Sequence, residues 1–93
     1  MNPHILFIID HNLNPDKYTK EQLDKNADAA YDAYDYAATY TVAYAAYAAA
    51  TACYACYHDD AHVAAYRLGR YFKQTGENKQ DYIDEINKEN NND

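Results

Sequence analysis

The sequence predicts an all-α fold, and three observations lead to that prediction. The chain of 93 residues contains only two Gly and two Pro, so few positions favour the end of a helix. Its apolar content is dominated by 17 Ala and 12 Tyr, and Ala has the highest helix propensity. Apolar residues also recur at helical three- and four-residue spacings. We expect a single helical domain over residues 1–93 with a short N-terminal helix, a long Ala/Tyr-rich helix and a C-terminal helix.

The first segment, residues 1–15, is expected to form a short helix or an arm. Asn2 followed by Pro3 is typical of a helix start, with Asn at the N-cap and Pro in the first turn. A strand over residues 4–9 is the alternative, but the chain offers no second strand to pair with it. The helix would run to residue 13 and present Ile5, Leu6, Ile8 or Ile9, and Leu13.

The second segment, residues 19–75, begins with the clearest local signal in the chain. Thr19 and Gln22 have the spacing of a capping box, and Tyr18 and Leu23 the spacing of a hydrophobic staple. No Gly or Pro follows until Gly69. One interpretation is therefore a single helix to about residue 74, roughly 80 Å long. The other is a helix pair broken at residues 58–60, where an Asp could cap the second helix.

The third segment, residues 78–90, is expected to be a helix that folds back. Gly76 is a typical C-terminal stop for the preceding helix, and Asn78 with Asp81 is typical of a new helix start. Its apolar residues are Tyr82, Ile83 and Ile86.

Composition and charge exclude several functional classes. Fifteen acids against eight bases give a formal charge of −7, which disfavours direct binding to nucleic acid and favours a partner with a basic surface. Residues 37–57 carry no charge and have the length of a membrane span, but no basic residue flanks them to set a topology, so we expect none. Two Cys three residues apart fit a reducing compartment.

The long segment carries a heptad-like stripe that we interpret as a core or oligomer seam. The opposite side, with Val42, Ala46, Ala49, Cys53 and Cys56, is small and suits close helix packing. A helix that is apolar on all sides is usually buried on all sides, so a homo-oligomer is expected. The seam comprises Tyr36, Tyr40, Tyr44, Tyr47, Tyr54, Leu68 and Phe72, with Thr51, His58, Ala61 and Ala65 at intervening positions.

A row of carboxylates precedes this stripe and is the candidate partner-binding site. On a helix the row would lie on one side with a carboxylate every 5–6 Å or so, close to the phosphate spacing of a DNA strand. The alternative is an ordinary solvated face near a helix N-terminus. The row comprises Glu21, Asp24, Asp28, Asp32 and Asp35, and the partner-binding set also includes Tyr31 and Tyr34.

Cys53, Cys56, His58 and His62 form the only cluster that suggests a metal. On a continuous helix the two Cys project away from the two His, so one ion could reach all four only if the helix broke at residue 58. We therefore expect no metal and no cofactor. The chain has no Ser and no Gly-rich loop, and we expect it not to be an enzyme.

Two motifs resemble a known class of proteins. Asn14-Pro15-Asp16-Lys17-Tyr18-Thr19 near the start and the run 76–86, GENKQDYIDEI, near the end are similar to small Ala-rich proteins encoded among the accessory genes of tailed bacteriophages. The resemblance implies a binder that acts in the host cytoplasm and inhibits a host defence or nucleic-acid-handling protein. The alternatives are a structural or assembly protein that oligomerises through its Tyr/Ala stripe, and a helical metal- or ligand-binding protein.

Overall fold

The computed structural model describes residues 1–90 and confirms the all-α class. No strand occurs in this range. The number of helices differs from the expected three. The five helices are α1 (Pro3–Leu13), α2 (Lys20–Asp35), α3 (Tyr40–Tyr57), α4 (Ala61–Thr75) and α5 (Lys79–Asn90).

The local start signals of the first two helices are confirmed. The side chain of Asn2 accepts hydrogen bonds from the backbone N–H groups of His4 and Ile5 at 2.8 and 3.2 Å. Thr19 Oγ1 accepts from the Gln22 N–H at 3.1 Å, and Gln22 Oε1 accepts from the Thr19 N–H at 2.8 Å. These caps satisfy backbone donors that a helix N-terminus would otherwise leave unpaired.

The expectation of one long helix over residues 19–75 is wrong, because this segment forms α2, α3 and α4. The break at 58–60 is the alternative that the sequence left open. There Asp59 adopts a left-handed backbone with φ of 59°, and the Asp60 side chain caps α4 through the Val63 N–H.

The break at residues 36–39 was not expected, since it contains neither Gly nor Pro. Thr39 caps α3 by accepting from the Val42 N–H at 3.2 Å. Because of the two breaks, the molecule's longest dimension is 40 Å, half of the roughly 80 Å expected for a continuous helix.

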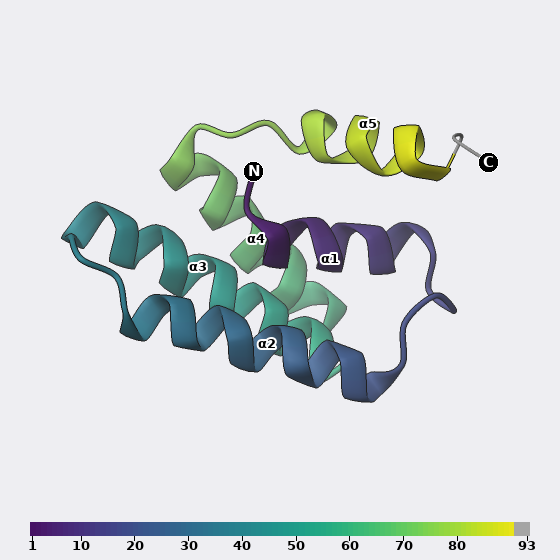
Figure 1. Cartoon of the computed structure of the whole chain (residues 1–93), viewed down its shortest axis with the longest axis horizontal. Helices are drawn as coiled ribbons and strands as arrows, with labels where there is room; N and C mark the ends of the chain where they lie inside the picture. Colours follow the sequence, from purple (N-terminus) through teal and green to yellow (C-terminus); the bar gives the residue numbers. More distant parts are fainter. Residues whose placement is uncertain (91–93) are drawn as a thin grey trace.

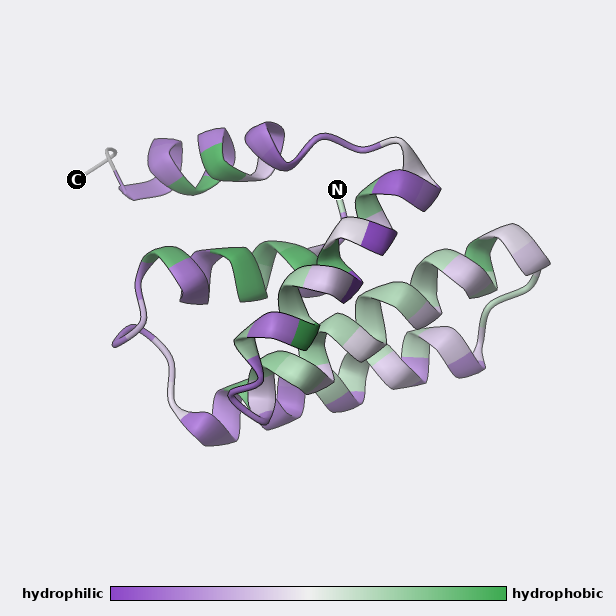
Figure 2. Ribbon diagram, turned by 180° about the vertical axis from the view of Figure 1, so that it is seen from behind, coloured by the Kyte–Doolittle hydropathy of each residue, from purple (hydrophilic) through white to green (hydrophobic). Residues whose placement is uncertain are grey.

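In Figure 1, α5 lies above α1 and α1 lies above the α2–α3 pair, while α4 rises behind α1 towards α5. Helix α3 packs between α2 and α4, α1 lies across α3 and α2, and α5 packs on α1. Figure 2 shows green, apolar segments in α1, whose Ile5, Ile8 and Ile9 are buried in the core with residues of α2 and α3. None of the helices described here is long and apolar enough to cross a membrane.

The core forms where α3 turns its small residues towards the other helices. Small side chains allow backbones to approach closely, so α1, α2 and α4 can all pack on this one helix. The residues of this hydrophobic core are Ile5, Ile8 and Ile9 of α1; Leu23, Ala27 and Ala30 of α2; Ala48, Ala49, Ala50, Ala52, Cys53 and Cys56 of α3; Leu68 and Tyr71 of α4; and Tyr82 and Ile86 of α5.

A buried carboxylate fixes the turn between α1 and α2. The side chain of Asp10, 7% exposed, accepts hydrogen bonds from Lys17 Nζ at 2.7 Å, the Tyr18 hydroxyl at 2.6 Å and Asn14 Nδ2 at 2.8 Å. Burial raises the pKa of Asp10, but the hydrogen bonds from Lys17, Tyr18 and Asn14 outweigh it, so the pKa lies below its ordinary value. The ring of Tyr18 also stacks on Phe7 at 4.1 Å.

A second carboxylate joins the two ends of the chain. Glu77, between α4 and α5, accepts hydrogen bonds from the hydroxyls of Tyr71 and Tyr82. The Tyr82 oxygen in turn accepts the backbone N–H of Asn2 at 2.9 Å. Burial is the main cause that raises the pKa of both tyrosines, so both hydroxyls remain protonated donors.

Candidate interaction surface

One side of the α2–α3–α4 layer exposes large aromatic rings, and we call it the tyrosine face. Helix α3 contributes Tyr40, Tyr44, Tyr47 and Tyr54, whose exposed fractions run from 42% to 85%. Helix α2 contributes the half-buried Tyr31 and the exposed Tyr34. A contiguous aromatic surface of this kind on a small domain is typical of a binding site.

The rings of the tyrosine face pack on one another between helices. Tyr31 meets Tyr54 edge-on with centroids 5.6 Å apart, and Tyr34 meets Tyr47 at 5.4 Å. At the end of α3 the Tyr54 ring also contacts His58 at 4.7 Å. Burial raises the pKa of Tyr31, which keeps this phenol neutral. These contacts hold the rings in a fixed arrangement, so the face loses little conformational entropy when it is covered.

The predicted seam is divided by the breaks in the helix. Tyr40, Tyr44, Tyr47 and Tyr54 lie on the tyrosine face, and Tyr36 lies at the end of α2 with 87% of its surface exposed. Leu68 is instead buried in the core, with the half-buried Phe72 packed against it. The seven residues therefore do not form one stripe, because that stripe required a continuous helix.

Three open hollows follow α3 along the tyrosine face. The first, about 220 Å³, lies between Tyr34 and the rings at the start of α3. The second, about 470 Å³, lies between Tyr44 and the pair Arg70 and Lys73 of α4. The third, about 380 Å³, lies between Tyr31, Tyr54 and Arg67. The face therefore extends across all three helices and is uneven enough to receive protruding side chains.

Charge changes sign across the tyrosine face. Helix α2 carries the five acids of the predicted row and the two bases Lys20 and Lys25, while α3 carries no charged residue. Helix α4 carries Arg67, Arg70 and Lys73 and no acid. The contribution of α4 was not predicted, although the absence of acids over residues 61–75 was readable in the sequence.

The predicted carboxylate row does lie along one side of α2. Four of its members are exposed and Asp24 is half-buried. Among the described residues, Glu21 alone of the five makes an ion pair, with Lys25 at 3.4 Å. The other four carboxylates are free to meet cations of another molecule.

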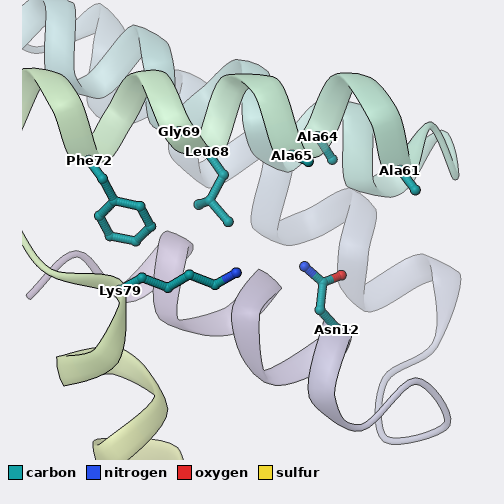
Figure 3. Close-up of a pocket in the computed structure, with 8 residues that line it drawn as sticks. All are labelled: Asn12, Ala61, Ala64, Ala65, Leu68, Gly69, Phe72 and Lys79. Atoms are coloured by element: carbon teal, nitrogen blue, oxygen red, sulfur yellow. The ribbon is translucent and has the colours of Figure 1, made fainter.

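A groove on another side of the molecule is less suited to a catalytic or binding site. A groove of about 300 Å³ between α1, α4 and the start of α5 is lined mainly by Ala61, Ala64, Ala65, Leu68, Gly69 and Phe72 (Figure 3). Lys79 and Asn12 approach it from the side of α5 and α1. Apart from these two polar groups its lining is small and apolar, which suits packing rather than catalysis.

The Cys/His cluster is separated by the fold. Cys53 and Cys56 are buried, while His58 at the end of α3 and His62 at the start of α4 are exposed. Burial raises the pKa of Cys53 to about 12 and raises that of Cys56 as well, so both thiols stay protonated. Within residues 1–90 no group of three or more His, Cys, Asp or Glu side chains is placed to hold a metal ion.

Comparison with known proteins gives no family for this chain, since it matches no protein-family model, no curated protein and no solved structure.

Proposed function

We propose that this chain is a small acidic binding protein that attaches to a basic surface of a host protein and inhibits it. The carboxylate row on α2 is the observation that carries the proposal. The resemblance of the sequence motifs at residues 14–19 and 76–86 to phage accessory proteins supports the inhibitory role, with a defence protein or a nucleic-acid-handling protein as the target. We propose binding rather than catalysis because the conspicuous side chains are phenols and carboxylates on an open surface.

The position of the row on α2 supports recognition of an extended basic site. With 3.6 residues per turn, Glu21 and Asp32 lie on the side of α2 opposite the core residues Leu23, Ala27 and Ala30. Asp24 and Asp35 lie at the edge of the row, about 60–80° from Ala27 around the helix. Successive carboxylates recur every 5–6 Å or so along this side. A basic cleft that binds a nucleic-acid backbone could accept such a row in place of phosphates.

Glu21 and Asp32 are the two members of the row best placed to contact a host protein. Taking about 100° per residue, Asp24 and Asp35 lie closest to Tyr31 around the helix, whereas Glu21 and Asp32 lie about 80–100° away from it. Glu21 and Asp32 therefore point away from the tyrosine face. They are the residues by which binding to a host protein can be tested separately from events on that face.

The test is an affinity capture from bacterial lysate with two matched variants. The test variant is Glu21→Gln with Asp32→Asn, which removes two charges and keeps side-chain size. The control is Asp81→Asn with Asp84→Asn, which removes two charges from α5. We expect a specific set of proteins to be retained by the wild type and the control and lost by the test variant.

A purified captured protein then gives the second measurement. If the row imitates a nucleic acid, duplex DNA should displace the chain from that protein, and the chain should inhibit its nucleic-acid binding. Equal recovery of the same proteins by both variants would show that the carboxylate row does not bind them. Displacement by salt alone, without competition from DNA, would refute the mimicry.

A further inference from the structure

The charge pattern of the tyrosine face is complementary to itself. An uncharged aromatic helix, α3, separates an acidic helix from a basic one: α2 has five acids and two bases, and α4 has three bases and no acid. Only another surface with the reverse order of charge would match it across all three helices. A second copy of the same face, correctly turned, has that order.

The exposed apolar area of the tyrosine face is also large enough for a protein–protein interface. Five of its tyrosines, Tyr34, Tyr40, Tyr44, Tyr47 and Tyr54, are 36–85% exposed. If a Tyr presents about 200 Å² when fully exposed, these five leave about 500 Å² of tyrosine surface in water. A standard interface covers about 800 Å² per partner. The tyrosines supply most of that area, and the exposed surfaces of α2 and α4 that border α3 supply the remainder.

We propose that the tyrosine face pairs with the same face of a second copy, about a two-fold axis parallel to α3. Two copies meeting face to face have two simple choices of two-fold axis. An axis across the helices lays α2 on α2 and α4 on α4, which opposes like charges. An axis along α3 lays α2 of each copy over α4 of the other and opposes acid to base.

The charges correspond along the helices as well as across them. Near the start of α3, Tyr34 contacts Tyr47, and Tyr44 shares a hollow with Arg70 and Lys73. Near its end, Tyr31, Tyr54 and Arg67 border a single hollow, which Asp60, the N-cap of α4, also lines. Rotation about a two-fold axis parallel to α3 leaves each residue at the same position along α3. It therefore brings Asp35, which follows Tyr34, towards Arg70 of the second copy. In the same way it brings Asp28, three residues before Tyr31, towards Arg67 of the second copy.

The dimer goes beyond the proposed function and does not depend on it. Asp24, Asp28 and Asp35 lie within about 60° of Tyr31 around α2 and face the second copy. Glu21 and Asp32 stay on the outer side, where a basic host protein could still reach them. The dimer therefore covers three of the five carboxylates of the row and leaves Glu21 and Asp32 to the host protein.

The first experiment measures oligomeric state of the full chain by sedimentation equilibrium. The wild type should be a dimer that weakens when salt is raised, because screening acts on exposed ion pairs. Asp28→Lys with Asp35→Lys should raise the dimer dissociation constant at least about tenfold, as should Arg67→Glu with Arg70→Glu. An equimolar mixture of these two variants should restore the dimer, since each then opposes unlike charges. Glu21→Lys with Asp32→Lys is the matched control and should leave the dissociation constant unchanged.

The second experiment measures orientation by cysteine cross-linking. Tyr44→Cys and Tyr54→Cys are made separately, and each is oxidised in air with copper–phenanthroline to join two thiols as a disulfide. An axis along α3 places each new Cys near its own counterpart, so each variant should form a cross-linked dimer alone. An axis across the helices keeps the counterparts of at least one position far apart, because the two residues are about 15 Å apart along α3. The wild type, whose two thiols are buried, is the control.

Several results would overturn the proposal. A monomer at roughly millimolar concentration with wild-type circular dichroism would remove the dimer. A dimer that neither charge reversal weakens would place the interface elsewhere. Cross-links that form only in a mixture of the two Cys variants would show the wrong axis. None of these results bears on host-protein capture through Glu21 and Asp32, so the two proposals can fail separately.

Discussion

Replacement of the buried Asp10 by Asn should destabilise the fold, because this side chain joins the end of α1 to the turn before α2. One of its oxygens accepts from both Lys17 and the Tyr18 hydroxyl, at 2.7 and 2.6 Å. An Asn side chain has a single acceptor oxygen and no charge. It must either present an NH₂ group to these two donors or give up its hydrogen bond with Asn14.

The loss can be estimated from the Tyr18 hydrogen bond alone. A hydrogen bond to a charged group contributes about 1.5–3 kcal/mol, against about 0.5–1.5 kcal/mol for a neutral pair. Loss of charge together with the misplaced donor gives an expected loss of about 2 kcal/mol in the free energy of unfolding. Lys17 adds little, because its side chain is 41% exposed and screened by water. For a chain of this length, the loss corresponds to a fall in Tm on the order of 10 °C.

The assay is urea denaturation followed by circular dichroism at pH 7, with Tyr18→Phe and the double variant completing a mutant cycle. Since the pKa of Asp10 is lowered in the fold, its stabilisation is fully present above the unfolded pKa of about 4 and is lost as pH falls through the folded pKa. The difference between wild type and Asp10→Asn should therefore shrink below about pH 4. A loss smaller than about 0.5 kcal/mol at pH 7, or additive single variants, would refute this account.

The remaining predictions concern the glycines and the thiols. Gly69→Ala should stabilise the fold by about 0.5–1 kcal/mol, since an added Cβ meets nothing within 4 Å in the middle of α4. Gly76→Ala should destabilise it by about 1 kcal/mol, because its φ of 74° is left-handed. Urea denaturation checks both, and the same sign for the two would contradict the backbone argument. Cys53 and Cys56 should react with a thiol reagent at pH 8 far more slowly than in urea-unfolded protein, because they are buried and their pKa values are raised. Prompt reaction of the native protein would show that α3 opens readily.

The candidate surface was only partly predictable. The carboxylate row and the Tyr-rich helix are periodic patterns, so their members could be read from spacing. Arg67 and Arg70 were missed because their role depends on α4 lying beside α3, antiparallel to it, which no local spacing encodes. Leu68 and Phe72 were placed with the tyrosines for the same reason. Their spacing continues the stripe, but the turn at residues 58–60 sends them into the core.

The sequence by itself determined the helical class and the helix boundaries that depend on local chemistry. Caps at Asn2, Thr19 and Asp60 and the stop at Gly76 are set by side chains within a few residues of the backbone groups they satisfy. Tertiary structure decided the turn at residues 36–39, where a weak local signal at Thr39 is sufficient because folding back lets α2 bury Leu23, Ala27 and Ala30. It also decided which side of α3 is covered. Small residues permit close packing and large rings prevent it, so the Ala and Cys side became the core and the Tyr side remained at the surface.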